Sequence, residues 1–397
     1  MKDSILVINC GSSSLKFAML ANSGQDTLFE GIADQLGSDN STITFKYQGQ
    51  KELTHLTVSS HENAVEQIKL WLDQHADIRD SMMGIGHRIV HGGETFGQSV
   101  LIDEEVINGI RECSSLAPLH NPAHIQGIHV AMNFFPGLPQ VAVFDTSFHQ
   151  TLSQEQYLYP IPMEFYREHH FRKYGFHGTS YRYISQQLAK LAPNSDQQGV
   201  LVAHLGNGAS TCAIHHGLSS DTSMGITPLE GLMMGTRSGS LDPSLLTFIM
   251  QAKNISAEEA LNILNKQSGL LGISELSNDC RTLEDAMVSG DERAKLALDM
   301  FAVRTAKYLA STATTLESID HLVFTGGIGE NSSYLRQVIC QQLRAFNIKL
   351  DAALNDNATR GKVSRIAAAD SATQIWVIPT NEELMIALDA ISLIQGL

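Results

Sequence analysis

Two short segments of the chain combine glycine and small polar side chains between apolar runs. Residues 5–17 have the sequence ILVINCGSSSLKF, and residues 201–214 have the sequence LVAHLGNGASTCAI. Each segment predicts a strand, a polar turn and a second strand, and such a turn offers backbone N–H groups and hydroxyls to a phosphate. Lys16 follows three serines, where it can meet a phosphate as a point charge. The two copies predict a duplicated fold that binds a nucleotide, although the first copy alone also fits an ordinary hairpin turn.

A third glycine-rich segment, 326–331, has the sequence GGIGEN and lies between a predicted strand and a helix expected to begin near Ser332. Glycine lets a ligand approach the backbone, and a helix N-terminus favours an anion. The chain contains no G-x-x-x-x-G-K-[ST] sequence, and Ser332 interrupts the G-x-G-x-x-G pattern. A Walker A loop is therefore excluded, and a Rossmann dinucleotide site is disfavoured. A tight turn that holds no ligand stays the alternative for this segment.

Arg88 and Arg237 lie beside glycine-rich turns, where the backbone can approach an anion. Their planar guanidinium groups predict clamps for carboxylate or phosphoryl oxygens. His87 and His91 have the i, i+4 spacing of a zinc pair, but on a strand this spacing separates them by roughly 13 Å. The chain also lacks an H-E-x-x-H sequence, so a zinc site is disfavoured.

Asp145 follows the short apolar run 141–144, which predicts a buried parallel strand. The carboxyl end of such a strand lies on the ligand side of an α/β sheet. A carboxylate at this place could position Mg²⁺ or orient a nucleophile. A helix N-cap is the structural alternative.

The elements that position these residues are predicted from apolar periodicity, caps and turn residues. Strands alternate with helices in both halves, which predicts an α/β protein with mostly parallel sheets. Asn121-Pro122 predicts the cap and the first position of one helix. The predicted strands are 5–8, 15–20, 41–47, 53–58, 85–90, 141–144, a strand-turn-strand unit at 200–214, 321–325 and 375–378, and the predicted helices are 63–75, 121–134, 243–252, 256–267, 291–317 and one from Glu382.

Length, charge and cysteine usage limit the class of protein. A chain of 397 residues is long enough for two domains, because single cores stop growing near ~250–300 residues. The net charge of −15 excludes a general basic surface for nucleic acid or an anionic membrane. Five scattered cysteines without a C-x-x-C pair indicate reduced thiols. No signal peptide and no apolar stretch near ~20 residues is visible, so we expect a cytoplasmic protein.

Ten segments in this order resemble motifs of the acetokinase (acetate kinase) family, within the acetate and sugar kinase/Hsp70/actin superfamily. Each motif is modestly specific alone, but together they span nearly the whole chain. The segments are VINCGSSSLKF at 7–17, GHRIVHGG at 86–93, LAPLHNPA at 116–123, VFDTSFH at 143–149, YGFHGTS at 174–180, HLGNGAS at 204–210, TPLEGLMMGTRSG at 227–239, DCR at 279–281, FTGGIGEN at 324–331 and PTNEEL at 379–384.

The resemblance implies an α/β fold of duplicated actin-like (ribonuclease H-like) domains, with mixed, mostly parallel sheets and a nucleotide cleft between them. An N-terminal actin-like domain is expected at 1–149, with the C-terminal helix 382–397 packing on it. A C-terminal actin-like domain that binds the nucleotide is expected at 150–381. A homodimer is also implied.

The activity implied by the resemblance is reversible, Mg²⁺-dependent transfer of the γ-phosphoryl group of ATP to acetate, giving acetyl phosphate and ADP by direct in-line transfer. The implied cofactors are ATP or ADP with Mg²⁺, which Mn²⁺ could replace. The implied partners are acetate or acetyl phosphate, with neither nucleic acid nor membrane. Because a carboxylate is already ionised at neutral pH, the reaction needs alignment and positive charge rather than a strong base.

The resemblance also assigns residues to roles. Arg88 would bind the carboxylate, Asp145 would be the essential acidic residue, and His177 and Arg237 would stabilise the transferring phosphoryl group. Asn9 and Glu382 would hold Mg²⁺. The residues implied around the substrate, besides Arg88, are Val90, Leu119, His120, Phe176 and Pro228. The residues implied for ATP and its phosphates are Ser12, Ser14, Lys16, His204, Leu205, Gly206, Asn207, Gly208, Asp279, Cys280, Arg281, Gly327, Ile328, Gly329, Glu330 and Asn331.

Some positions depart from the family pattern. Ser240 stands where an aspartate commonly follows Thr-Arg-Ser-Gly, and Tyr181 stands where a histidine often follows Gly-Thr-Ser. Without the carboxylate at position 240, the bracing of the Arg237 loop could differ. Neither position is one of the implied catalytic residues.

Two other functions remain as alternatives. Propionate kinases share almost every motif, but Val90 leaves less room than the alanine of propionate-preferring relatives, which favours acetate. One methylene is worth only ~1–3 kcal/mol of discrimination, so we expect propionate to be tolerated. A non-catalytic actin-like ATP-binding module is the other alternative. The cluster of Arg88, His177 and Arg237 argues against it, because a nucleotide switch needs no carboxylate clamp.

Overall fold

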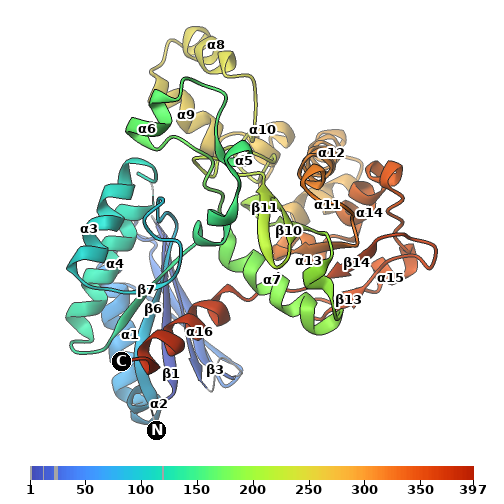
Figure 1. Cartoon of the computed structure of the whole chain (residues 1–397). Coiled ribbons are helices and arrows are strands. Elements are labelled where there is room, and N and C mark those ends of the chain that lie inside the picture. Colours follow the sequence, from blue (N-terminus) through green and yellow to red (C-terminus); the bar gives the residue numbers. More distant parts are fainter. Residues whose placement is uncertain (1, 12, 22–25, 119) are drawn as a thin grey trace. The chain divides into compact units, whose positions relative to one another are not determined.

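The structure is a computed structural model that describes residues 2–11, 13–21, 26–118 and 120–397. The chain forms two compact units, which we call unit 1 (1–148 with 381–397) and unit 2 (149–380) (Figure 1). Across the described ranges, no helix is both long and apolar enough to cross a bilayer.

Unit 1 is built on a mixed sheet with the strand order β5-β4-β3-β2-β1-β6-β8-β7. Side chains of β1 alternate between the two faces of this sheet: Leu6 and Ile8 belong to one core cluster, and Ile5 and Val7 belong to another. Both faces are therefore covered. The strands are β1 (Ser4–Cys10), β2 (Leu15–Ala21), β3 (Asp26–Asp34), β4 (Thr42–Tyr47), β5 (Gln50–His55), β6 (Met82–Ile89), β7 (Val100–Leu101) and β8 (Gln140–Phe144).

Helices cover the two faces of the unit 1 sheet. α1 (His61–Gln74) and α4 (Asn121–Phe134) pack on one face, and the C-terminal α16 (Glu382–Gln395) packs on the other against β1, β6 and β8 (Figure 1). α16 begins after Asn381, whose side chain accepts a hydrogen bond from Leu384 N at 2.9 Å. The shorter helices of unit 1 are α2 (Ala76–Ser81) and α3 (Glu104–Glu112).

Unit 2 is built on a second mixed sheet, with the order β11-β10-β9-β12-β14-β13. The long helix α12 packs against β9 and β10. The strands are β9 (Val200–Leu205), β10 (Ala209–His215), β11 (Leu218–Thr222), β12 (His321–Thr325), β13 (Ser364–Arg365) and β14 (Gln374–Val377). The helices are α5 (Gln154–Tyr157), α6 (Glu164–His169), α7 (Gly178–Leu191), α8 (Ser244–Lys253), α9 (Ala257–Lys266), α10 (Gly269–Ser274), α11 (Cys280–Val288), α12 (Glu292–Thr312), α13 (Gly326–Asn331), α14 (Ser333–Gln342) and α15 (Ala352–Asp356).

The same strand arrangement occurs in both units. β3-β2-β1-β6-β8 in unit 1 and β11-β10-β9-β12-β14 in unit 2 each contain consecutive antiparallel strands followed by parallel ones. The predicted duplication and the mixed α/β sheets are therefore confirmed. The expectation of mostly parallel sheets is wrong, because most neighbouring strands among the described residues are antiparallel. Hairpin connections join β1 to β2 and β9 to β10, and only strand-helix-strand crossovers produce parallel neighbours.

Several element boundaries differ from the prediction. β3 was not predicted, and the strand expected at 53–58 is β5 at Gln50–His55. The helix expected at 291–317 ends at Thr312. Asn121 is not a cap: the N-cap position of α4 is His120, and the buried Asn121 side chain donates to His91 O and Ile110 O. The segment 326–331 is not an open turn but the short helix α13, so its backbone groups are partly used within the helix.

Candidate active site

Arg88 and Asp145 form a bidentate ion pair at the ends of adjacent parallel strands in unit 1. Arg88 lies on β6, and Asp145 directly follows β8. Arg88 Nε donates to Asp145 Oδ1 at 3.1 Å, and Nη2 donates to Oδ2 at 2.6 Å. The Asp145 side chain is 1% exposed, whereas 20% of the Arg88 side chain is exposed. Both carboxylate oxygens are thus engaged in orienting a guanidinium that solvent can reach, which is not the geometry of a helix N-cap.

The charge of Arg88 is maintained by its neighbours. Burial alone would lower the pKa of Arg88, but the carboxylates of Asp145 and Glu382 outweigh this effect and raise the pKa above its ordinary value. A fixed and accessible guanidinium of this kind can bind a carboxylate or a phosphoryl oxygen.

A small cavity of unit 1 beside Arg88 is lined by Asn9, Lys16 and Glu382. Asn9 and Lys16 lie opposite each other in the β1–β2 hairpin, and Glu382 is the first residue of α16. The buried Oε1 of Glu382 has no hydrogen-bond partner among the described residues. Burial raises the pKa of Glu382 to about 7, although Arg88 opposes the shift. An unpartnered carboxylate oxygen in a cavity that an asparagine side chain also lines fits the oxygen ligands that Mg²⁺ prefers.

The turn between β1 and β2 is closed by a hydrogen bond from Gly11 N to Ser14 O at 2.7 Å. Ser14 is half-buried and Lys16 is exposed, so this turn presents polar groups to solvent beside Asn9. Ser12, also predicted to contact phosphate, lies outside the described residues.

The residues predicted to surround the substrate come from both units. Val90 directly follows β6 and is 7% exposed, and His120 precedes α4. Leu119 lies outside the described residues. Phe176, which is 2% exposed, and Pro228 belong to unit 2, so the structure does not place them relative to Val90.

In unit 2, His177 occupies the N-cap position of α7 with a left-handed backbone, φ +58°. Such a conformation is uncommon for a histidine and is found where the surroundings impose it. His177 Nδ1 lies 2.8 Å from Ser210 Oγ on β10, and its ring stacks on His204 with centroids 4.2 Å apart. His204 Nδ1 lies 2.9 Å from Ser180 Oγ. The two imidazoles are therefore held in fixed orientations at the ends of β9 and α7.

Arg237 and His177 converge beside Gly208. A Cβ added to Gly208 would lie 3.5 Å from both Arg237 Nη1 and His177 Nε2. Burial lowers the pKa of Arg237. The glycine therefore leaves open a space that a guanidinium nitrogen and an imidazole nitrogen both border, which suits an anionic oxygen.

A cavity of about 690 Å³ in unit 2 is lined by eight of the residues predicted to contact ATP: Gly206, Asn207, Asp279, Cys280, Arg281, Gly327, Ile328 and Asn331. Its volume lies in the range of small-molecule sites, about 300–1,000 Å³. The other lining residues were not predicted and are Asn278, Glu284, Asp285, Ser332 and Arg360. Asn278 adjoins the motif at 279–281 and Ser332 stands at a predicted helix start, so both could have been found from their neighbours. Nothing in the local sequence indicates Glu284, Asp285 or Arg360.

The other residues predicted for ATP have different surroundings. Leu205 is fully buried, and Gly329 is buried within α13. Glu330 Oε1 accepts a hydrogen bond from Thr380 N at 3.2 Å. His204 and Gly208 lie with His177 and Arg237, as described above. None of these residues is among those that line the cavity of unit 2.

Arg336 donates hydrogen bonds to backbone carbonyls of α13. This residue was not identified from the sequence. Its guanidinium is buried and donates to Gly329 O at 2.9 Å and to Glu330 O at 3.0 Å. It also donates to Asn355 Oδ1 at 2.7 Å. An isolated arginine in a helix carries no sequence signal for such a role.

Ser240 braces the Arg237 loop without a carboxylate. Its Oγ accepts hydrogen bonds from Gly231 N at 3.0 Å and from Tyr308 Oη at 2.5 Å. Its carbonyl accepts a hydrogen bond from Arg304 Nη1 at 3.2 Å. The serine thus ties the loop to α12 through hydrogen bonds.

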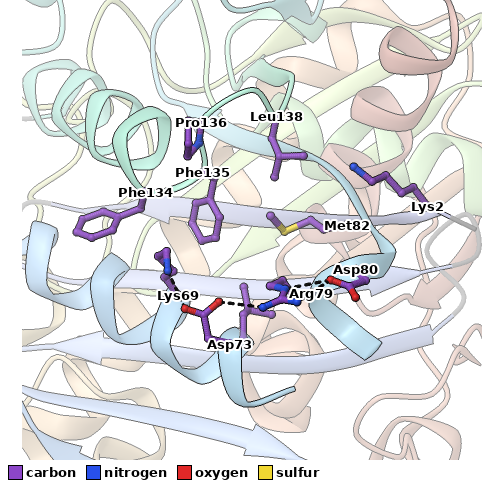
Figure 2. Close-up of a pocket in the computed structure, with 11 residues that line it drawn as sticks. Lys2, Lys69, Asp73, Arg79, Asp80, Met82, Phe134, Phe135, Pro136 and Leu138 are labelled. Carbon is purple, nitrogen blue, oxygen red and sulfur yellow. Dashed lines mark hydrogen bonds and ion pairs between the residues drawn. The ribbon is translucent and has the colours of Figure 1, made fainter. Parts of the chain in front are cut away.

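Unit 1 also has a cavity of about 350 Å³ away from these residues (Figure 2). Its walls are apolar side chains such as Phe135 and Leu138, and its rim carries an ion-pair chain. Lys69 and Arg79 both contact Asp73 in this chain. None of the predicted site residues lines this cavity, so it is not a candidate active site.

Comparison with known proteins places the whole chain in one family. Residues 4–388 match the model of the acetokinase family. The chain is 53% identical to an acetate kinase of Chromobacterium violaceum over 99% of both chains, and 50% identical to one of Shewanella oneidensis over 98% of both. It resembles the crystal structure of a propionate kinase from Francisella tularensis (TM-score 0.93, 45% identity, 98% of both chains). It also resembles that of Porphyromonas gingivalis acetate kinase (TM-score 0.92, 41% identity, 98% of this chain and 99% of that one). The chain therefore belongs to the acetokinase family.

Proposed function

We propose that the chain is an acetate kinase that transfers the γ-phosphoryl group of ATP reversibly to acetate, giving acetyl phosphate and ADP. The observation that carries this proposal is the Arg88–Asp145 pair. It holds a guanidinium in a solvent-accessible position in unit 1, while the cavity of nucleotide size lies in unit 2. A protein that only binds nucleotide has no need for this second anion clamp.

In this proposal, unit 1 contains the residues that bind acetate and Mg²⁺. Arg88 binds the acetate carboxylate with the N–H groups that Asp145 leaves free, and Asp145 keeps the guanidinium oriented. Asn9 and Glu382 would hold Mg²⁺, which would neutralise phosphate charge. The described residues contain no cluster of three or more His, Cys, Asp or Glu side chains suited to a metal. A magnesium ion held by one carboxylate and one amide would keep waters and phosphate oxygens as its other ligands.

Unit 2 contains the residues that bind the nucleotide and the transferring phosphoryl group. The ATP nucleoside would occupy the cavity lined by Asp279, Arg281 and Gly327. His177 and Arg237 would donate to the equatorial oxygens of the transferring phosphoryl group beside Gly208. An acetate oxygen forms the new bond to the γ-phosphorus as the bond from that phosphorus to the β–γ bridging oxygen breaks and ADP leaves. No proton has to be removed, because the acetate is already ionised.

The reaction requires residues from both units. We therefore propose that 1–149 with the helix 382–397 is the domain that takes acetate, and that 150–381 is the domain that takes the nucleotide. We also propose that the active molecule is a homodimer. α8 in unit 2 has no buried residue, and its Leu245 and Phe248 side chains are 42% and 60% exposed. Exposed apolar helix faces of this kind are typical of protein interfaces.

A propionate kinase is the second candidate, favoured by the similarity to the Francisella tularensis structure. The curated acetate kinases at 50–53% identity favour acetate. Val90 reduces the room for an extra methylene. The expected result is a higher kcat/KM for acetate than for propionate, within the roughly 10–200-fold that one methylene can provide. A propionate value above the acetate value would reverse the assignment.

The deciding experiment measures ADP formation from ATP with acetate and Mg²⁺ and traps acetyl phosphate as the hydroxamate. Equal amounts of ADP and hydroxamate are expected. ATP hydrolysis without hydroxamate, or no turnover with either acid, would contradict the proposal. Arg237→Ala is the matched variant, and it should lower turnover by orders of magnitude while ATP binding persists. Turnover at the wild-type level in that variant would remove Arg237 from the mechanism.

A further inference from the structure

Two buried hydroxyl groups lie behind His177 in unit 2. Ser210 Oγ is 2.8 Å from His177 Nδ1, and Tyr181 Oη is 2.5 Å from Ser210 Oγ. Ser210 and Tyr181 are both fully buried. Tyr181 lies on the first turn of α7 and Ser210 lies on β10, so two elements join behind one imidazole.

The chemistry of these groups indicates where the protons are. Ser210 Oγ carries one proton and can donate it to only one of its two neighbours. A phenol is a stronger acid than an aliphatic alcohol and is therefore the better donor, so Tyr181 donates to Ser210. Ser210, whose own proton is then not taken by Tyr181, can donate it to His177 Nδ1 when that nitrogen is unprotonated. The proton of the neutral imidazole is therefore on Nε2.

The Nε2 atom is the nitrogen that borders the space beside Gly208, at the same distance from an added Cβ as Arg237 Nη1. With its proton on Nε2, His177 presents a donor to an anion in that space. With its proton on Nδ1, His177 would present a lone pair, which repels phosphoryl oxygens. The tautomer therefore decides whether His177 helps or opposes the transfer.

We infer that Tyr181 is a positioning residue that acts through Ser210 to hold His177 as the Nε2–H donor. This inference rests on the proposed phosphoryl transfer. In this chain a tyrosine thus orients His177, at a position where relatives often carry a histidine. Each hydroxyl polarises the next in such a chain, which strengthens the bond to the imidazole.

Tyr181→Phe removes the hydroxyl that contacts Ser210 Oγ and keeps the ring. We expect kcat to fall about three- to tenfold with KM for acetate unchanged, because His177 Nε2 faces the phosphoryl group and its donor bond matters most in the transition state. Ser210→Ala removes the direct partner of Nδ1 and should lower kcat further, again at constant KM. Tyr174→Phe is the matched control. It deletes another buried tyrosine hydroxyl, which donates to His170 O at 3.0 Å, and should keep the wild-type kcat.

Nitrogen-15 NMR of protein labelled at histidine provides a readout that a merely structural role would not change. The His177 signal is assigned by its absence in His177→Ala. In the wild type we expect an unprotonated Nδ1 and a protonated Nε2, and in Tyr181→Phe a growing share of the other tautomer. A protonated Nδ1 in neutral wild-type His177, or an unchanged kcat and spectrum in Tyr181→Phe, would overturn the inference. The spectrum needs no substrate, so it stays decisive even if acetyl phosphate is not formed and the proposed function fails.

Discussion

At the scale of single residues, Arg88 and Asp145 show how one buried carboxylate prepares a cation for binding. Both oxygens of Asp145 accept hydrogen bonds from Arg88, and 20% of the Arg88 side chain remains exposed to solvent. The acidic residue therefore acts on the substrate through the arginine. This role needs an ionised aspartate, because a neutral amide accepts only through one oxygen.

Asp145→Asn should separate this role from simple packing, since the side chain keeps its size. We expect kcat/KM for acetate to fall about 100-fold or more, with most of the loss in KM for acetate and little change in KM for ATP. Removing one partner of a buried charge pair typically costs about 2–5 kcal/mol. Steady-state kinetics with varied acetate measure the loss, and the circular dichroism spectrum controls for folding. A loss smaller than tenfold would show that Arg88 does not depend on Asp145.

At Gly208, the absence of a side chain leaves the room that the proposed phosphoryl transfer needs. Gly208→Ala would place a methyl group 3.5 Å from both His177 Nε2 and Arg237 Nη1, in the space that these two nitrogens border. We expect turnover to fall about 100-fold, because even a small misplacement of reacting groups is costly, while ADP binding changes only slightly. Gly327→Ala is the control, since a Cβ there meets no described atom within 4 Å but projects from a residue that lines the 690 Å³ cavity. That variant should change nucleotide affinity, measured by calorimetry, more than turnover. The reverse pattern would exchange the roles of the two glycines.

At the scale of elements, α4 buries a histidine whose polar groups are not satisfied within the described part of the chain. His124 on α4 is 3% exposed, and neither of its ring nitrogens has a hydrogen-bond partner among the described residues. Burial lowers the pKa of His124 to about 3, helped by the charge of Arg88. Burial also lowers the pKa values of His87 and His149 to about 4. These histidines are neutral in the folded protein and take up protons on unfolding at mildly acidic pH.

The pH dependence of stability follows from these directions. The unfolded pKa of histidine is about 6.5, so the stability contributed by the neutral form is present above that pH and is lost as the pH falls toward the folded values. The melting temperature should therefore fall between pH ~6.5 and ~4. His124→Leu should reduce the slope of the unfolding free energy against pH by up to about 1.4 kcal/mol per pH unit. The unfolding free energy at pH ~7 should stay equal or become higher. Thermal melts across this range test it. A steeper slope in the variant would mean that His124 is protonated in the fold.

At the scale of the whole molecule, the two units repeat one strand order with different residues at equivalent places. The hairpin of β1 and β2 presents Asn9 and Lys16, and the hairpin of β9 and β10 presents His204 and Ser210. We expect the first set to serve metal and phosphate and the second to serve the phosphoryl donor. The duplication explains the scaffold, and the unequal side chains explain the proposed kinase chemistry.

The proposed homodimer is tested through α8. Phe248→Glu puts a charge in the middle of the exposed apolar side of this helix, and burying that charge at an interface is strongly unfavourable. We expect the wild type to have the mass of a dimer by light scattering after size exclusion, and the variant to have that of a monomer. Leu296→Glu is the control, because Leu296 is 54% exposed but lies on α12. A dimeric Phe248→Glu variant would place the interface elsewhere, and a monomeric wild type would contradict the dimer.

Local interactions explain why much of the fold could be predicted from the sequence. The hairpin at 5–20 and the strand before Asp145 depend on neighbours within a few residues, and both are present. β3 could not be recognised because Gly31 interrupts its pattern, and that glycine is needed where the Phe17 ring crosses the strand.

The sequence by itself determined the family, the duplicated α/β plan and the residue types that phosphoryl transfer requires. Only the tertiary structure decided how those residues are paired. Arg88 meets Asp145 across 57 positions of sequence, and His177 meets Ser210 across 33. Such pairs depend on which strands become neighbours and in which register, and local periodicity contains no information about that choice. The motifs therefore specify the chemistry, and the packing of strands and helices specifies which atom of each motif can take part in it.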